Sequence, residues 1–140
     1  SDVYKRQIIN SAINYLKKNN IDNEIIAGGE TAGIPYAAYI SEKLKKPMVY
    51  IRKKPKGFGI NKQIEGNFHK NQSALLVEDL ATDGGSKITF INAMREAELK
   101  VKDIFVIFYY LELEFNNALP IKPKTIGENL EAEPKNGVKL

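Results

Sequence analysis

The sequence predicts an α/β fold in which helices flank both faces of a parallel sheet. Short apolar runs alternate along the chain with segments of helical periodicity, which is the pattern of βαβ units. Crossovers between parallel strands place the connecting helices over the faces of such a sheet. A chain of 140 residues has room for one domain of this kind and little else.

Spacing of apolar residues predicts the individual elements. In the first helix Ile8, Ile9, Ala12, Ile13 and Leu16 recur at helical intervals. In the third helix the residues on one face are Phe90, Ala93, Met94 and Ala97. The second helix is expected to begin at Pro35, because proline is tolerated in a first turn. The expected helices cover residues 8–19, 35–45 and 87–99, and the expected strands cover residues 24–27, 48–53, 74–77 and 104–110.

Three segments have no sustained period. Residues 54–70 contain Pro55 and several glycines, so they are expected to form a long loop. Loops of that length in compact domains are usually functional lids or disordered. A domain over residues 1–115 is expected to be followed by an irregular, disordered tail over residues 116–140. Residues 1–7 are unlike the start of a natural domain and are expected to be foreign to it.

Composition excludes several classes of site. The chain has no cysteine, so it has no disulfide framework, thiolate nucleophile or Cys-ligated zinc. No apolar run reaches membrane-spanning length and none has the form of a secretory signal. We therefore expect a cytoplasmic protein with no membrane partner.

Basic residues are concentrated in one stretch. The net charge is +4, yet residues 43–62 hold eight basic side chains and no acidic one. Such a run is typical of a surface that binds nucleic acid, a phosphorylated small molecule or pyrophosphate, and it is also compatible with a solvated face. The eight residues are Lys43, Lys45, Lys46, Arg52, Lys53, Lys54, Lys56 and Lys62.

The strongest chemical signal lies at the end of the strand expected over residues 74–77. Two adjacent acids, Glu78 and Asp79, follow this apolar run and precede a Gly-rich turn that opens a helix. A helix N-terminus with glycines beside it suits a phosphate, and the hydroxyls of Thr82 and Ser86 can add donors. Paired carboxylates next to that phosphate can accept hydrogen bonds from sugar hydroxyls. The combination predicts a ribose 5-phosphate site.

An ordinary βα turn is the alternative, since acids, threonine and serine all favour helix starts. That alternative explains Asp83 and Ser86 well. It does not explain two adjacent acids at the end of an apolar strand.

Residues 74–86, with the sequence ALLVEDLATDGGS, resemble the phosphoribosyl pyrophosphate (PRPP) signature of type I phosphoribosyltransferases. Two further motifs extend the resemblance. The sequence GGETAGIP at residues 28–35 is similar to the pyrophosphate loop of that family. The sequence VYIRKKPKGFG at residues 49–59, followed by QIEG at residues 63–66, resembles the mobile catalytic loop of orotate phosphoribosyltransferases. The similarity covers about residues 8–110.

The resemblance assigns roles to these residues. It implies that Arg52, Lys53 and Lys56 contact the pyrophosphate as catalytic cations, where they offset the negative charge that develops on the leaving group. It implies that Thr82 also lies near orotate. The PRPP-binding residues that it implies are Thr31, Ala32, Glu78, Asp79, Leu80, Ala81, Thr82, Asp83, Gly84, Gly85 and Ser86.

The resemblance also implies a cofactor and an assembly. Mg²⁺ is expected as the cofactor, carried by the substrate rather than held by protein side chains. Residues 54–66 are expected to close over the site of a neighbouring subunit and to exclude water, which implies a homodimer. PRPP and orotate are the expected small-molecule partners.

Departures from the family pattern concern mainly the base. Phe58 stands where many members have a histidine, and Ala32 stands where many have a lysine. Leu111 follows Tyr110, so the orotate-contacting arginine expected there is missing. The N-terminal hood that covers the base is also expected to be missing. We therefore expect a partial chain with an intact phosphoribosyl half and an incomplete base half.

Three functions follow from these observations. The first is an orotate phosphoribosyltransferase of pyrimidine synthesis, and the second is a noncatalytic PRPP-binding module or an inactive fragment of such an enzyme. The third, a nucleic-acid-binding domain, is the weakest, because residues 43–62 lack the interleaved aromatics of a stacking platform. We therefore expect no nucleic-acid partner.

Overall fold

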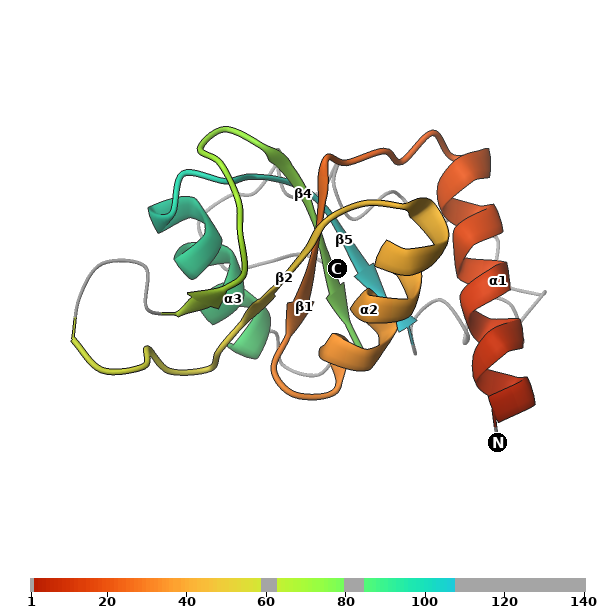
Figure 1. Cartoon of the computed structure of the whole chain (residues 1–140), viewed down its shortest axis with the longest axis horizontal. Coiled ribbons are helices and arrows are strands. Elements are labelled where there is room, and N and C mark those ends of the chain that lie inside the picture. Colours follow the sequence, from red (N-terminus) through yellow and green to blue (C-terminus); the bar gives the residue numbers. More distant parts are fainter. Residues whose placement is uncertain (1, 59–62, 80–84, 108–140) are drawn as a thin grey trace.

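A five-stranded sheet forms the centre of the chain (Figure 1). The computed structural model describes residues 2–58, 63–79 and 85–107. Its elements are α1 (Asp2–Lys18), β1 (Ile25–Gly29), α2 (Gly33–Leu44), β2 (Met48–Ile51), β3 (Ile64–Glu65), β4 (Ser73–Glu78), α3 (Gly85–Glu96) and β5 (Lys100–Val106).

The sheet is mostly parallel, as the sequence predicts. Its strand order is β3-β2-β1-β4-β5, and β1 pairs in parallel with both β2 and β4. β5 extends the sheet in parallel beyond β4, whereas β3 pairs with β2 in the antiparallel direction. The central position of β1 puts the turn after this strand between the turns that follow β2 and β4.

Helices cover both faces, with α1 and α2 on one side and α3 on the other (Figure 1). Successive side chains of a strand point to opposite faces of the sheet, so each strand contributes to two hydrophobic layers. Ile26 of β1 and Leu75 of β4 pack in the α1–α2 layer, while their neighbours Ala27 and Leu76 pack in the α3 layer. Strands that are buried on both faces need continuous apolar runs, which is why β1 and β4 show no polar alternation.

The apolar stripes predicted for the first and third helices are confirmed. In α1 Ile8 is half-buried and the other four residues of the stripe are buried. Phe90, Ala93 and Met94 of α3 are buried, as is Ala97 just after the helix. Fully burying a leucine, isoleucine or phenylalanine side chain contributes about 1.5–3 kcal/mol. The packing of these faces therefore holds the helices against the sheet.

Several boundaries differ from the prediction. α1 begins at Asp2, so residues 2–7, expected to lie outside the domain, continue the helix. α3 ends at Glu96 and β5 begins at Lys100, because backbone pairing with β4 starts four residues before the buried apolar run at Ile104. The end of the last predicted strand and the predicted tail lie outside the described residues.

The expectation of one continuous loop over residues 54–70 was wrong in part. Ile64 and Glu65 form β3 and pair with Ile51 and Tyr50 of β2. Two residues are too few to show a period, so only the partner strand reveals this pairing. Within the described part of the chain, no helix is long and apolar enough to span a membrane.

Candidate functional site

The carboxyl ends of β2, β1 and β4 lie side by side at one edge of the sheet. Gly29 is in register with Ile51 of β2, and Gly28 is in register with Val77 of β4. Ligands of open α/β sheets bind outside this edge. The topology therefore brings three predicted segments together: the turn after β1, the basic segment after β2, and the acids that end β4.

Glu30 ties the turn after β1 to the basic segment. Its backbone N–H donates to the carbonyl of Ile51 at 2.9 Å, and its carboxylate Oε2 accepts from the backbone N–H of Lys53 at 2.7 Å. The sequence prediction did not single out Glu30. Its role depends on hydrogen bonds to a strand about twenty residues away, for which no local pattern exists.

The turn itself presents backbone at the start of α2. Thr31 and Ala32 are exposed, and Ala32 at the N-cap has no side chain that can cap the helix. The first turn of α2 also has no acidic residue. The positive end of the helix is thus left for an external anion. Gly33 packs on β4, where a Cβ would overlap the carbonyl oxygen of Val77.

The side chain of Glu78 lies across Gly29 on the α3 face of the sheet. A Cβ at position 29 would overlap Glu78 Oε1 and would come within 2.6 Å of Phe90 Cε2. Only glycine leaves this space, so Gly29 and Phe90 together shape the place where the Glu78 carboxyl lies. The side chain is 6% exposed, and its Oε1 has no hydrogen-bond partner among the described residues.

Burial raises the pKa of the Glu78 carboxyl to about 7. Lys87 opposes this shift, Asp79 adds to it, and Lys53 opposes it more weakly. A carboxyl with this pKa can either accept or donate a hydrogen bond near neutral pH. Perturbed acids in such positions are frequent at functional sites.

Lys87 is a feature that the sequence prediction missed. It is 2% exposed, three residues before Phe90 in α3, and its charge acts on the buried Glu78 carboxyl. The available signal was its spacing, since Lys87, Phe90 and Ile91 lie on one helix face. A lysine in an apolar stripe indicates a buried charge with a partner.

Arg52 is oriented by its neighbours in the sheet. Its Nε lies 3.0 Å from Glu65 Oε1, and its Nη2 donates to the Tyr50 hydroxyl at 3.2 Å. The guanidinium carbon also lies 5.6 Å from the centroid of the Tyr50 ring. The guanidinium thus bridges β2 and β3 at the edge where the pyrophosphate cations were predicted.

The two lysines of the segment are less constrained. The backbone N–H of Lys53 donates to Glu30, and its side chain is exposed. The charge of that side chain lowers the pKa of Glu78. Lys56 is exposed beside Gly57, which has a φ of +72°, and Phe58 is fully exposed. Lys53 is therefore the predicted cation whose charge acts on Glu78, while Lys56 lies in an open segment.

The structure covers the PRPP signature in part. Asp79 follows Glu78 and is half-buried, and Gly85 begins α3. Ser86 lies in the first turn of α3. The predicted residues Leu80, Ala81, Thr82, Asp83 and Gly84 lie outside the described residues. His69 is exposed.

The donor set does not form a metal cage. In residues 2–58, 63–79 and 85–107, no three His, Cys, Asp or Glu side chains are grouped to hold a metal ion. Glu78 and Asp79 are two carboxylates at the open edge of the sheet. Such a pair fits a hydrated Mg²⁺ that arrives on phosphate oxygens, because Mg²⁺ usually keeps several waters and few protein ligands.

No protein-family model matches the chain. The orotate phosphoribosyltransferase of Ruegeria sp. is 51% identical over 104 residues, which is 74% of this chain and 43% of that protein. That of Cereibacter sphaeroides is 54% identical over 102 residues, which is 73% of this chain and 40% of that protein. The chain thus spans less than half the length of these relatives.

Solved structures agree with the sequence relatives. Orotate phosphoribosyltransferase from Aeropyrum pernix has a TM-score of 0.66 and 26% identity, covering 76% of this chain and 59% of that one. An adenine phosphoribosyltransferase has a TM-score of 0.66 at 16% identity, covering 76% of this chain and 69% of that one, which supports the fold alone. Over about three quarters of its length, the chain is a homologue of the orotate phosphoribosyltransferases and has the type I phosphoribosyltransferase fold.

Proposed function

We propose that this chain contains the phosphoribosyl-binding part of an orotate phosphoribosyltransferase of pyrimidine synthesis. The reaction transfers the phosphoribosyl group of PRPP to orotate and yields orotidine 5′-phosphate and pyrophosphate. The observation that carries the proposal is the Glu78–Asp79 pair at the end of β4, beside the turn after β1 and within reach of the charge of Lys53. The 51% identity to a named orotate phosphoribosyltransferase supports it.

The acid pair suits the ribose. A hydrogen bond that involves a charged group contributes about 1.5–3 kcal/mol, and Glu78 Oε1 has no hydrogen-bond partner in the described part of the chain. In the proposal Glu78 and Asp79 bind the ribose hydroxyls. The 5-phosphate lies at the start of α3, with residues 80–86 around it. Thr31 and Ala32 present backbone N–H groups to the pyrophosphate.

The basic segment suits the leaving group. As the bond between ribose C1 and the pyrophosphate oxygen breaks, negative charge develops on the pyrophosphate and positive charge on the sugar. Arg52, Lys53 and Lys56 stabilise the former in the proposal. Closure of residues 54–66 excludes the water that would otherwise attack the sugar. We also propose that this segment serves the site of the second subunit in a homodimer.

Mg²⁺ would be held mainly by the pyrophosphate oxygens and water, with Asp79 as the described side chain best placed to contact its waters. When bound, it neutralises charge on the pyrophosphate. Orotate is the proposed acceptor, with Thr82 beside it. The parts of the relatives that this chain does not span are proposed to complete the base side of the site.

Calorimetric titration of PRPP with Mg²⁺ tests the binding half of the proposal. Asp79→Ala should weaken PRPP roughly ten- to a hundredfold, since one or more charge-assisted hydrogen bonds are lost. Asp22→Ala is the matched control, because Asp22 is an acid that pairs with Lys46, away from the site. Equal affinity of Asp79→Ala and the wild-type chain would overturn the proposal.

Consumption of orotate, followed by its ultraviolet absorbance in the presence of PRPP and Mg²⁺, tests the catalytic half. A chain that binds PRPP but does not consume orotate would be a binding module. In that case the same assay on a version extended to the length of the relatives decides whether the missing parts supply the activity.

A further inference from the structure

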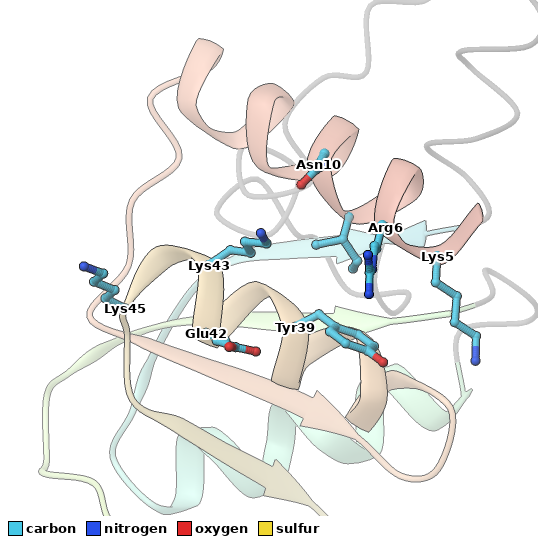
Figure 2. Close-up of a pocket in the computed structure, with 8 residues that line it drawn as sticks. Lys5, Arg6, Asn10, Tyr39, Glu42, Lys43 and Lys45 are labelled. Carbon is cyan, nitrogen blue, oxygen red and sulfur yellow. The ribbon is translucent and has the colours of Figure 1, made fainter. Parts of the chain in front are cut away.

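A groove lies between α1 and α2, on the face of the sheet opposite α3 (Figure 2). Its volume is about 720 Å³, and four basic side chains line it. Lys5 and Arg6 come from the first turns of α1, while Lys43 and Lys45 come from the end of α2 and the residue after it. The groove therefore gathers charge from segments almost forty residues apart in the sequence.

Helical spacing explains why these side chains meet. Arg6 precedes the buried Ile9 by three residues and therefore lies on the same face of α1, one turn closer to the N-terminus, where it is exposed. On α2, Tyr39 and Lys43 are four residues apart and flank the buried Ile40. Figure 2 shows Arg6 pointing toward Tyr39, and Lys43 pointing toward α1.

The positive charge of the groove exceeds the negative charge of the described residues that line it. No described side chain forms an ion pair with Lys5, Arg6, Lys43 or Lys45. Lys46 behaves differently, since its Nζ lies 3.0 Å from Asp22. Glu42 is the one acidic residue among those that line the groove in the described part of the chain, so a clear positive excess remains.

The groove is separate from the candidate site. Gly33, at the start of α2, packs against β4 at the candidate site, and Lys43 follows ten residues later. Ten residues of α-helix span about 15 Å. Lys43 and Lys45 belong to the basic run of the sequence, yet their place in the fold leaves them no part in binding the pyrophosphate of PRPP.

We propose that this groove is a second anion site, which binds the oligophosphate group of a nucleoside polyphosphate. Arg6 from α1 and Lys43 from α2 bind the phosphates from the two sides of the groove, with Lys5 and Lys45 at its two ends. Asn10 offers an amide to the same space. The ring of Tyr39, 46% exposed, gives the base an aromatic surface for stacking.

The test uses the whole chain in the background Lys53→Gln/Lys56→Gln, which weakens the candidate pyrophosphate site. Tripolyphosphate and ATP are titrated by calorimetry at low ionic strength. Arg6→Gln/Lys43→Gln should weaken both ligands about three- to tenfold, the range for exposed charge contacts. Lys17→Gln/Lys18→Gln is the matched control, because it removes the same charge from exposed positions of α1 outside the groove, and it should change affinity less than twofold.

Two further readouts locate the ligand. Tyr39→Ala should weaken ATP several-fold while leaving tripolyphosphate unchanged, because only the nucleotide has a base to stack. The side-chain amide resonance of Asn10 should shift during both titrations. Thermal unfolding of each variant checks that it is folded, and Lys43→Glu serves as a second charge variant if the double variant is not.

Three outcomes would overturn the proposal. The first is equal weakening by the Lys17/Lys18 control, which would mean a general field effect. The second is no oligophosphate binding in the Lys53→Gln/Lys56→Gln background, which would assign all binding to the candidate site. The third is a concentration-dependent dimer in sedimentation that Arg6→Gln/Lys43→Gln abolishes, which would make the groove an interface between copies of this chain.

Discussion

Glu78 on β4 lies over Gly29 on β1, and the carboxyl fills the space that any other side chain at position 29 would need. Phe90 of α3 closes the same space from the helix side. The acid is thus placed by packing rather than by a hydrogen bond to its Oε1 from the described residues. The position of Glu78, which is proposed to bind the ribose, therefore depends on the absence of a Cβ at position 29 of the neighbouring strand.

Replacing Gly29 with alanine tests this dependence. The added Cβ must displace Glu78 or Phe90, and overpacking of this kind costs about 1–3 kcal/mol. The free energy of unfolding, measured in urea, should fall by that amount, and PRPP affinity should fall with it. Gly57→Ala is the comparison, since nothing lies within 4 Å of the Cβ that it adds and its cost is confined to the φ of +72°. A Gly29→Ala variant with wild-type affinity for PRPP would show that Glu78 does not bind the ligand.

The raised pKa of Glu78 predicts a pH-dependent stability. Between about pH 4.5 and pH 7 the unfolded chain ionises this carboxyl while the folded protein keeps it protonated. The unfolded state therefore binds fewer protons, and stability falls as the pH rises through this window and levels off above it. Glu78→Gln removes this dependence. Relative to wild type, the variant should gain about 1–2 kcal/mol between pH 4 and pH 8, after allowance for solvent screening.

Urea unfolding of the two proteins at pH 4 and pH 8 measures this difference. Glu96→Gln, an exposed carboxyl on α3, reports the effect of removing a surface acid. A constant difference between Glu78→Gln and wild type at both pH values would mean that Glu78 ionises in the folded protein as it does in the unfolded chain.

The contact of Arg52 with Glu65 predicts a gain in anion binding. Glu65 lies 3.0 Å from Arg52 Nε and offsets its charge. Glu65→Gln keeps the shape and removes that negative charge, so calorimetry at low ionic strength should show pyrophosphate bound about two- to fivefold more tightly. The free energy of unfolding should change little, because exposed ion pairs contribute little to stability. Unchanged or weaker pyrophosphate binding would mean that Glu65 orients Arg52 for the ligand.

Lys56 is predicted to act on the transition state. If residues 54–66 close over PRPP, Lys56 meets the pyrophosphate mainly as the bond breaks, so its loss lowers turnover more than binding. In a version extended to the length of the relatives, Lys56→Ala should lower kcat substantially and leave PRPP affinity nearly unchanged. Lys70→Ala is a control on a lysine that pairs with Glu98 instead. A rise in KM with unchanged kcat would assign Lys56 to ground-state binding.

Mixing variants tests the proposed sharing of the loop. Lys56→Ala and a variant changed at both Glu78 and Asp79 should each be poorly active alone. Heterodimers would contain one site with an intact loop and intact acids, so mixing should restore part of the activity. Heterodimers that form without any recovery would mean that residues 54–66 serve their own subunit.

Local pattern was enough to predict the class of fold and the principal helices and strands. The stripe of α1 and the apolar run of β4 follow from the order of nearby residues, because helix and strand periods are properties of neighbours in the sequence. The same holds for the acid pair at the end of β4, since carboxyl ends of parallel strands meet at one edge. The strand β3 was missed, because two residues carry no period and pair only with a distant partner.

By itself, then, the sequence determined which segments are strands and helices and which residues stand where the strands end. Only the tertiary structure decided which side chains meet across those segments. Glu65 pairs with Arg52, Glu30 accepts from the backbone of Lys53, and Lys87 is buried near Glu78. It also divided one basic run into two places, with Lys53 at the candidate site and Lys43 in the groove beside α1. Contacts of this kind depend on register and packing between elements, which no local period encodes.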